Sequence, residues 1–259
     1  MAGTRREFTR AIVRRPGANL AAGLTSSRLG PPDLETALLQ HDAYVKALET
    51  AEVQVTALAA DERFPDATFI EDTAVLVPEA AVIARPGAAS RLGEEETIAD
   101  SLLPRYRLLE HIHSPGTLEG GDVLQVGRHF YIGLSQRTNR DGAEQLGRIL
   151  SGFGYTFSLV PLRHVLHLKT GVAYLGESHL LAAGEFLEEP LFSGLSILPV
   201  PPEESYAANS VRINGFVLVP KGYDQTRARI ERAGFRVIEV DVSEFRKLDG
   251  GLSCLSLRF

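Results

Sequence analysis

The feature of this sequence that most restricts its fold is an order of elements that recurs roughly every 40 to 50 residues. Two short apolar runs joined by a turn predict a hairpin, an amphipathic stretch predicts a helix, and a third apolar run predicts a strand. The four predicted hairpins are 73–77 with 81–84, 122–126 with 129–132, 172–175 with 179–182, and 211–213 with 216–219. The helix and third strand that follow them are 94–103 and 106–109, 141–150 and 155–160, a shortened helix near Glu185 and 195–199, and 224–233 and 235–240. Repeats of this length are typical of arrays and propellers.

Two of these repeats also resemble each other in sequence. Residues 151–162 read SGFGYTFSLVPL, and residues 232–242 read RAGFRVIEVDV. Each is the end of a predicted helix, then a glycine, then a predicted strand. The likeness indicates that the repeats are copies of one module.

The first repeat differs, because only one strand, 8–13, precedes its helix at 33–50 and its strand at 53–58. The β-prone tail at 255–259 would supply the missing strand, so the two chain ends would pair and close a ring. Closure removes exposed sheet edges. We therefore predict an α+β fold of five modules in one domain that covers residues 1–259. An open α/β sheet is the alternative, but the chain lacks the regular strand–helix alternation that such a sheet needs.

Composition excludes several classes of function. The 259 residues carry a formal net charge of −6, which gives no electrostatic support for nucleic-acid binding. A single cysteine cannot form an intrachain disulfide, and no apolar run approaches the ~18 residues that span a membrane. The basic N-terminus, MAGTRREFTRAIVRR, lacks the apolar run of a signal peptide. We expect a cytoplasmic protein that has no membrane contact.

Each module has a polar residue just before its first hairpin strand or, in the tail, at the start of the closing strand. These residues are Asp72, Glu119, His167, Asn209 and Cys254. Their spacing follows the repeat, so a ring would gather them at one end of its axis. A lone cysteine is more often a packed, unreactive thiol than a nucleophile. The predicted proximity of an imidazole and two carboxylates favours the interpretation of Cys254 as a nucleophile.

The gathered groups predict a chemistry. A thiolate nucleophile needs a lowered pKa or a nearby base, and an imidazole can protonate a leaving group and then deprotonate water. Additional carboxylates would raise the thiol pKa unless they bind a cation. A guanidinium is planar, charged and able to form paired hydrogen bonds with carboxylates. The segment FPDATFIED supplies Asp66, Glu71 and Asp72 for that purpose, although a solvated acidic turn would have the same composition.

Five motifs, in order along the chain, resemble those of the dimethylarginine dimethylaminohydrolases: FPDATFIEDTAVL, ARPGAASR, LEGGDVL, LHLKT and the DGGLSC tail. The resemblance covers nearly the whole chain. It implies the five-bladed αβ propeller, or pentein fold, of the guanidino-group-modifying superfamily, built from ββαβ-type repeats. It also implies hydrolysis of Nω-methylated arginines (asymmetric dimethylarginine and monomethylarginine) to citrulline and a methylamine, through a covalent thiouronium on cysteine and without a cofactor.

The same resemblance implies a role for each matching residue. Cys254 would attack the guanidinium carbon, and His167 would protonate the departing amine and then activate water. Glu119 would hydrogen-bond His167 and the substrate. Asp72 would grip the guanidinium, with Glu71 supporting the pocket.

A second group of matching residues would hold the amino-acid end of the substrate. Arg91 and Arg137 match positions that bind its carboxylate, and Asp66 with the backbone carbonyls of Leu24 and Leu248 match positions at its α-amino end. Leu24 lies in a Gly- and Ala-rich segment, so the resemblance favours a lid over residues 17–30, where a plain connector is the alternative. Arg137 could instead pair with a structural carboxylate.

Other interpretations remain open at this point. His164 with His167, and His111 with His113, are spaced as metal ligands can be, but no cysteine or carboxylate completes a set, so we predict no metal. An arginine deiminase, a citrulline hydrolase or an amidinotransferase would use similar chemistry, although the larger ones carry insertions that this chain lacks. A non-catalytic propeller that binds a partner is a more distant alternative. We expect a monomer or a homodimer that acts on a small molecule.

Overall fold

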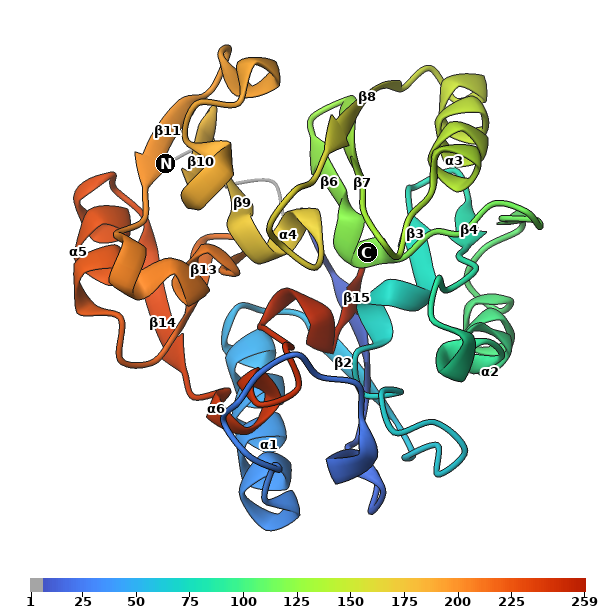
Figure 1. The fold of residues 1–259 in the computed structure, drawn as a ribbon, viewed down its shortest axis with the longest axis horizontal. Helices are drawn as coiled ribbons and strands as arrows, with labels where there is room; N and C mark the ends of the chain where they lie inside the picture. Colours follow the sequence, from blue (N-terminus) through green and yellow to red (C-terminus); the bar gives the residue numbers. More distant parts are fainter. Residues whose placement is uncertain (1–6) are drawn as a thin grey trace.

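Each predicted module is a small three-stranded sheet in the computed structural model, which describes residues 7–259. Five such sheets are arranged around a common centre, with the longer helices toward the outside (Figure 1). In four sheets an antiparallel hairpin is extended by a third strand parallel to the hairpin's second strand. They are β3 (Ala74–Leu76), β4 (Ala81–Ile83) and β5 (Leu109–His111); β6 (Val123–Val126), β7 (His129–Leu134) and β8 (Thr156–Pro161); β9 (Val172–Gly176), β10 (His179–Ala182) and β11 (Ser196–Pro199); and β12 (Val211–Ile213), β13 (Phe216–Pro220) and β14 (Arg236–Val240).

The remaining sheet pairs the two ends of the chain. Its central strand, β1 (Arg10–Arg14), runs parallel to β2 (Gln54–Leu58) and antiparallel to β15 (Leu257–Arg258). The backbone N–H of Phe259 donates to the carbonyl of Arg10 over 2.9 Å, and the Arg10 N–H donates back to the Phe259 carbonyl over 2.8 Å. The predicted pairing of the N-terminal strand with the C-terminal tail is confirmed.

Within residues 7–259, four helices of nine or more residues each connect two strands of one module. They are α1 (Leu34–Thr50), α2 (Glu94–Leu102), α3 (Arg140–Gly152) and α5 (Asp224–Arg232). As predicted, Asp33 caps α1: its carboxylate accepts a hydrogen bond from the Thr36 N–H over 2.8 Å. The module of β9–β11 has two short 3₁₀ turns, η5 (Gly184–Phe186) and η6 (Pro190–Phe192), at the place where the sequence predicts a shortened helix.

The apolar core lies between neighbouring modules as well as within them. Ile12 of β1 and Leu257 of β15 pack in one cluster with Ile83 of β4. Val82 of β4 packs in another cluster with Phe130 of β7. Because burial of one such side chain contributes about 1.5–3 kcal/mol, each module gains part of its stability from the next one around the ring.

Two predicted strand boundaries are wrong. The strand predicted at 106–109 begins only at Leu109, because the N–H of Tyr106 still bonds the Leu102 carbonyl at the end of α2. The closing strand does not start at Cys254, which lies in the 3₁₀ turn η8 (Ser253–Leu255), and β15 begins at Leu257. The Cys254 N–H donates to the Gly251 carbonyl over 3.2 Å, so the chain makes a turn before it reaches the sheet.

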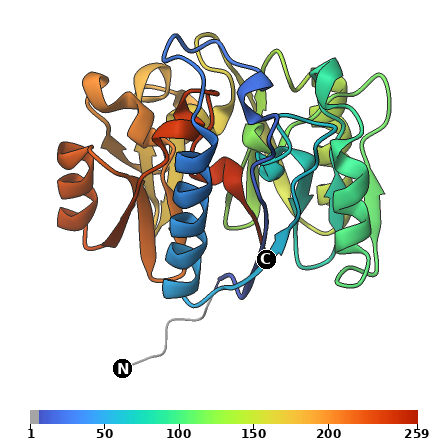
Figure 2. The same ribbon diagram turned by 90° about the horizontal axis from the view of Figure 1, so that it is seen from below.

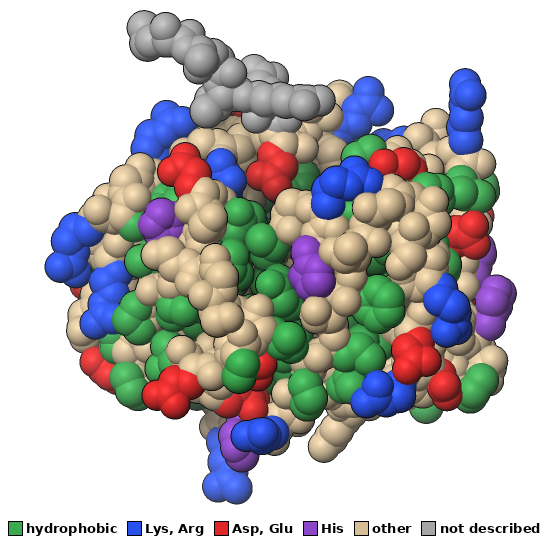
Figure 3. All heavy atoms as spheres, turned by 90° about the horizontal axis from the view of Figure 1, so that it is seen from above, with side chains coloured by type: hydrophobic (Ala, Val, Ile, Leu, Met, Phe, Trp, Pro, Cys, Tyr) green, Lys and Arg blue, Asp and Glu red, His purple; other side chains and the backbone are tan. Residues whose placement is uncertain are grey.

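Charged side chains of both signs are distributed over the surface of the protein. On the face drawn in Figure 3, acidic and basic side chains are interspersed with apolar ones, and no large field of one sign appears there. Within residues 7–259, no helix is both long and apolar enough to cross a bilayer. Residues 1–6, the first part of the stretch considered for a signal peptide, lie outside the described residues.

Candidate active site

In four of the five modules, a short helical turn holds, or directly follows, one of the polar residues whose spacing matches the repeat. Asp72 lies in η2 (Ile70–Thr73), Glu119 directly precedes η4 (Gly120–Asp122), His167 directly precedes α4 (Leu168–Gly171), and Cys254 lies in η8. All four residues are buried, and η2 contacts both η4 and η8, while α4 contacts η4. The ring therefore brings together side chains that are up to 182 positions apart in the chain.

His167 is held by a carboxylate and surrounded by others. Its Nε2 lies 2.7 Å from Oε2 of Glu119, a residue with no exposed surface. Burial by itself would lower the pKa of His167, but Asp72, Asp122 and Glu119 outweigh it and raise the pKa to about 9. Asp122 is fixed in turn, because it accepts hydrogen bonds from the Leu168 N–H at 3.0 Å and the Ser135 hydroxyl at 2.7 Å. At neutral pH the imidazole is a cation that can donate a proton.

The thiol of Cys254 also keeps its proton at neutral pH, and it is therefore uncharged. Burial raises the pKa of Cys254 to about 12, and the charges of Asp72 and Glu71 add to the effect, while Lys169 opposes it. The site at rest is therefore a neutral thiol beside an imidazolium. A cation placed next to the sulfur would offset the acidic charges and favour the thiolate.

Asp72 and Arg91 form a buried ion pair beside the thiol. Arg91 Nη1 donates to Asp72 Oδ2 over 2.6 Å, and the Gly121 N–H donates to Asp72 Oδ1 over 2.9 Å. Although burial raises the pKa of Asp72, His167 and Arg91 lower it to about 2, so this carboxylate stays charged. Most remaining donors of Arg91 are also occupied: Nε and Nη2 bond the carboxylate of Glu94, and Nη2 also bonds the Phe69 carbonyl.

The two glycines of LEGGDV, Gly120 and Gly121, occupy positions where a larger side chain would collide with its neighbours. A Cβ on Gly121 would lie 2.8 Å from Nδ1 of His167 and 2.9 Å from Oδ1 of Asp72. A Cβ on Gly120 would lie 2.0 Å from the backbone oxygen of Glu71. Only glycine lets η4 approach the imidazole and the neighbouring turn this closely. The sequence alone predicts no part in the site for these two glycines.

A small cavity of about 30 Å³ lies at the centre of these residues. It is lined by Leu24, Asp66, Phe69, Asp72, Arg91, Arg137, Leu166, His167, Leu248, Asp249, Gly250 and Cys254. The structure therefore brings most of the predicted site residues together in one pocket. Glu119 lies behind it, where Oε1 also accepts from Arg137 Nη1 at 3.3 Å and from the Gly87 N–H at 3.1 Å. The lining residues Phe69, Leu166, Asp249 and Gly250 were missed by sequence reading, because an apolar or turn residue carries no chemical signal.

The segment predicted as a lid covers this pocket. The Leu24 N–H donates to both carboxylate oxygens of Asp66, at 3.0 and 3.2 Å. Further along, the hydroxyls of Thr25 and Ser27 both donate to the backbone carbonyl of Lys247. In Figure 2 this blue segment, which precedes α1, passes over one end of the ring. Whether the segment moves stays a prediction.

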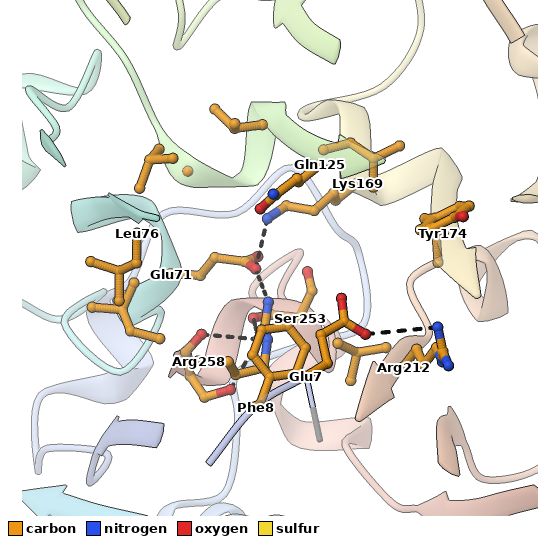
Figure 4. Close-up of a pocket in the computed structure, with 18 of the residues that line it drawn as sticks. Glu7, Phe8, Glu71, Leu76, Gln125, Lys169, Tyr174, Arg212, Ser253 and Arg258 are labelled. Atoms are coloured by element: carbon orange, nitrogen blue, oxygen red, sulfur yellow. Dashed lines mark hydrogen bonds and ion pairs between the residues drawn. The ribbon is translucent and has the colours of Figure 1, made fainter. Parts of the chain in front are cut away.

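Glu71 does not line the small pocket. It faces a separate cavity of about 170 Å³ near the axis of the ring, shown in Figure 4. There Glu71 Oε1 accepts from Lys169 Nζ at 2.7 Å and from Arg258 Nη2 at 2.5 Å. Arg258 Nη1 in turn donates to the Ser253 carbonyl over 2.9 Å. The carboxylate thus links the turn that follows His167 with the turn that carries Cys254.

One group of side chains in the described part of the chain has the composition of a metal site. Potential ligand atoms of Asp72, Glu119 and His167 all lie within 4.8 Å of one another. Arg91 and Arg137 contact the same two carboxylates, so cations of the protein already balance them. These charges oppose the binding of a further cation at the three ligand atoms. The two histidine pairs considered from the sequence do not form this group.

The fold and the buried thiol, imidazole and carboxylates define a class: the five-bladed αβ propellers that modify guanidino groups. Residues 33–190 match the family model described as N,N dimethylarginine dimethylhydrolase, eukaryotic. The chain belongs to the dimethylarginine dimethylaminohydrolase family, as its motifs predict. It is 53% identical to the N(G),N(G)-dimethylarginine dimethylaminohydrolase of Pseudomonas aeruginosa, over 97% of this chain and 100% of that one. It is 37% identical to the enzyme of the same name from Streptomyces coelicolor, over 96% of each chain.

Solved structures agree with this assignment. A cysteine-to-serine mutant of the Pseudomonas aeruginosa enzyme complexed with citrulline has a TM-score of 0.96 and 52% identity, over 97% of this chain and 99% of that one. A histidine-to-glycine variant of a dimethylarginine dimethylaminohydrolase, in an adduct with S-methyl-L-thiocitrulline, also gives 0.96 and 52%, over 97% and 100% of the two chains. The N-terminal domain of ArgZ, an arginine dihydrolase from cyanobacteria, shares the fold at 19% identity and a TM-score of 0.88. The predicted pentein fold is confirmed.

Proposed function

We propose that this protein hydrolyses Nω-methylated arginines to citrulline and methylamine or dimethylamine. The observation that carries the proposal is one pocket lined by Cys254, His167 and Asp72, in which the thiol and the imidazole both hold their protons before substrate binds. The names of the relatives support the substrate class, because dimethylarginine occurs in both. The citrulline complex of the Pseudomonas enzyme supports the product.

The first half of the reaction forms a covalent intermediate. The guanidinium beside Asp72 offsets the acidic charges around Cys254, so the thiol releases its proton to solvent as substrate binds. The thiolate attacks the guanidinium carbon and forms a C–S bond. His167, protonated at neutral pH, gives its proton to the methylated nitrogen, and the C–N bond breaks to release the amine. An S-alkylthiouronium remains on Cys254.

The second half returns the enzyme to its starting state. His167, now neutral, takes a proton from water as the water oxygen bonds the thiouronium carbon. The C–S bond then breaks, the second water proton passes to the sulfur, and citrulline and the free cysteine thiol are formed. In the overall reaction, one methylated arginine and one water are converted to one citrulline and one amine. Glu119 stabilises the imidazolium and keeps its ring oriented between the two halves, as the 2.7 Å hydrogen bond supports.

The remaining pocket residues suit the amino-acid end of the substrate. Arg137, with one Nη1 contact to Glu119, keeps more free donors than Arg91 for the α-carboxylate. Asp66 and the backbone carbonyls of Leu24 and Leu248 accept from the α-ammonium. Since a cavity of about 30 Å³ has room for about one water, the lid opens for substrate to enter.

Glu71 supports this pocket from outside it. Its ion pairs with Lys169 and Arg258 connect the turns of the base and the nucleophile, so it shapes the site without substrate contact. The steps proposed above use only side chains of the described residues and water, and none of them requires a metal ion or an organic cofactor.

Product analysis with four substrates tests the proposal. Purified protein is incubated with asymmetric dimethylarginine, monomethylarginine, arginine and citrulline, and citrulline, ornithine and amines are quantified. We expect citrulline and the matching methylamine from the first two, and no product from them with Cys254→Ser. Preferential turnover of arginine would assign a deiminase. Turnover of methylarginines by the folded Cys254→Ser variant would refute the nucleophile.

A further inference from the structure

Asn209 occupies the fourth module's position in the ring of polar residues, yet the reaction above gives it no task. It directly follows η7 (Pro202–Ala208) and precedes β12, as the other members precede their strands. Only 6% of its surface is exposed. Asn209 does not line the small pocket but the wider groove beside it, next to Gly251 and the lid residues Ser26 and Ser27.

The amide of Asn209 bridges the two turns that carry the base and the nucleophile. Its Nδ2 donates to the Lys169 backbone carbonyl over 2.9 Å and to the Ser253 hydroxyl over 3.1 Å. Its Oδ1 accepts from the Ser253 backbone N–H over 2.9 Å. Lys169 is two residues beyond His167, and Ser253 directly precedes Cys254. One side chain therefore uses both of its donor hydrogens and one acceptor to tie these two segments.

The surroundings are built around this bridge. A Cβ on Gly251 would lie 2.5 Å from the Asn209 amide carbon and Oδ1, so the glycine is needed for the amide to reach Ser253. The Ser253 hydroxyl, which receives one of the amide hydrogens, lies 4.0 Å from the Cys254 sulfur. A shift of Ser253 would therefore move the nucleophile directly.

We propose that Asn209 is a positioning residue that sets the distance and orientation of Cys254 relative to His167. The inference rests on the proposed function, since it concerns the same reaction. Only an amide satisfies the three contacts at this length. Aspartate keeps the acceptor for Ser253 but loses both donors and adds a negative charge near a thiol that already has acidic neighbours. Alanine loses all three hydrogen bonds.

Kinetics of Asn209 variants test the proposal. Because a misplacement of about 1 Å can cost on the order of 100-fold in rate, we expect Asn209→Ala to lower kcat at least tenfold, with KM changed less than threefold. Asn209→Asp should lose at least as much, and its alkylation by 2-chloroacetamidine should need higher pH than that of the wild type. Ser253→Ala, which removes one of the three contacts, should lower kcat by a smaller factor.

A matched control separates positioning from stability. The Asn214 side chain also joins distant segments, through hydrogen bonds to the backbone of Glu7, Phe8 and Ala51, away from the pocket. Asn214→Gly, which keeps the positive φ of 52°, should lower the melting temperature and leave kcat within twofold. Equal kcat losses in Asn209→Ala and Asn214→Gly, or a folded Asn209→Ala with kcat within twofold of wild type, would overturn the proposal.

Two further measurements keep the test decisive. If Asn209→Ala does not fold, Asn209→Asp decides by the same kcat criterion. If the wild type makes no citrulline from any substrate, the proposed function fails, and the alkylation rate of Cys254 by 2-chloroacetamidine still tests positioning without turnover. A rate in Asn209→Ala at least tenfold below wild type would support the role, and an equal rate would refute it.

Discussion

Asp249 and Ser26 are 223 residues apart in the chain, yet the Asp249 carboxylate accepts hydrogen bonds from both the backbone N–H and the hydroxyl of Ser26, over 2.5 and 2.9 Å. Asp249 lines the small pocket, and Ser26 belongs to the segment that covers it. The contact fastens the covering loop to the chain that leads to Cys254. The backbone of Asp249 has a φ of +58°, which asparagine and aspartate tolerate better than most residues.

The first prediction concerns this contact. Asp249→Asn keeps the left-handed backbone but replaces the charged acceptor with a neutral one, so the loop should open more often. We expect cleavage within residues 17–30 by a dilute protease to become several-fold faster, with the melting temperature little changed. Thr36→Ala, which removes a hydroxyl at the exposed start of α1, serves as a control. Equal cleavage rates in Asp249→Asn and the wild type would contradict a fastening role.

Glu119→Gln tests the charge behind the imidazole. Glutamine can still hydrogen-bond His167 but no longer supports its positive charge, so the pKa of His167 should fall from about 9. We expect kcat to drop on the order of 100-fold, and the alkaline limb of the rate profile to move to lower pH. Circular dichroism checks that the variant is folded. An unchanged alkaline limb would show that another group titrates there.

Alkylation of Cys254 tests its resting state. Because the pKa of Cys254 is raised to about 12, almost all of it is thiol at pH 7, and neutral iodoacetamide should react slowly and ever faster up to high pH. The cationic 2-chloroacetamidine should react much faster at pH 7, because its charge stabilises the thiolate beside Asp72. Mass spectrometry of the adduct gives both rates. Rapid iodoacetamide labelling at pH 6 would refute the neutral thiol.

Gly121→Ala tests the close approach of η4 to the imidazole. The added methyl would lie 2.8 Å from Nδ1 of His167, so the ring or the turn must shift, and kcat should fall by at least tenfold. Gly152→Ala is the matched control, because a Cβ there meets no atom within 4 Å. We expect that control to keep wild-type kcat. Retention of activity by Gly121→Ala would mean that the ring position is not critical.

The buried His41 should make the free energy of unfolding depend on pH. Burial lowers its pKa to about 4 from 6.5, so the native state resists protonation that the unfolded chain accepts. The contribution of neutral His41 to the free energy of unfolding is complete above about pH 6.5 and is lost as the pH falls toward 4. This contribution differs by about 2 kcal/mol between pH 7.5 and pH 5. Urea unfolding of the wild type and His41→Leu at both pH values measures it. The free energy of unfolding of His41→Leu should fall less between pH 7.5 and pH 5 than that of the wild type. An equal fall in the two proteins would exclude His41 as the cause.

Local patterns in the chain were enough to predict the modules and the family. Hairpin patterns with period 2, helices with a capping residue such as Asp33, and glycine turns are local signals, because they depend on backbone geometry within a few residues. Regular spacing of Asp72, Glu119, His167 and Cys254 followed from the repeat, so the ring end that they share was predictable as well. The motifs carried the resemblance, and the comparisons bear it out.

The pairing of charges across modules, in contrast, depends on how the ring assembles in three dimensions. That Arg91 is occupied by Asp72 and Glu94, that Glu71 faces the axial cavity, and that Asn209 ties two catalytic turns together could not be read from the chain. These contacts join residues from different modules, and their partners depend on how far each turn projects toward the axis. Protonation follows the same logic: burial and neighbouring charges set the pKa values of Cys254 and His167, and neither is a local property of the sequence.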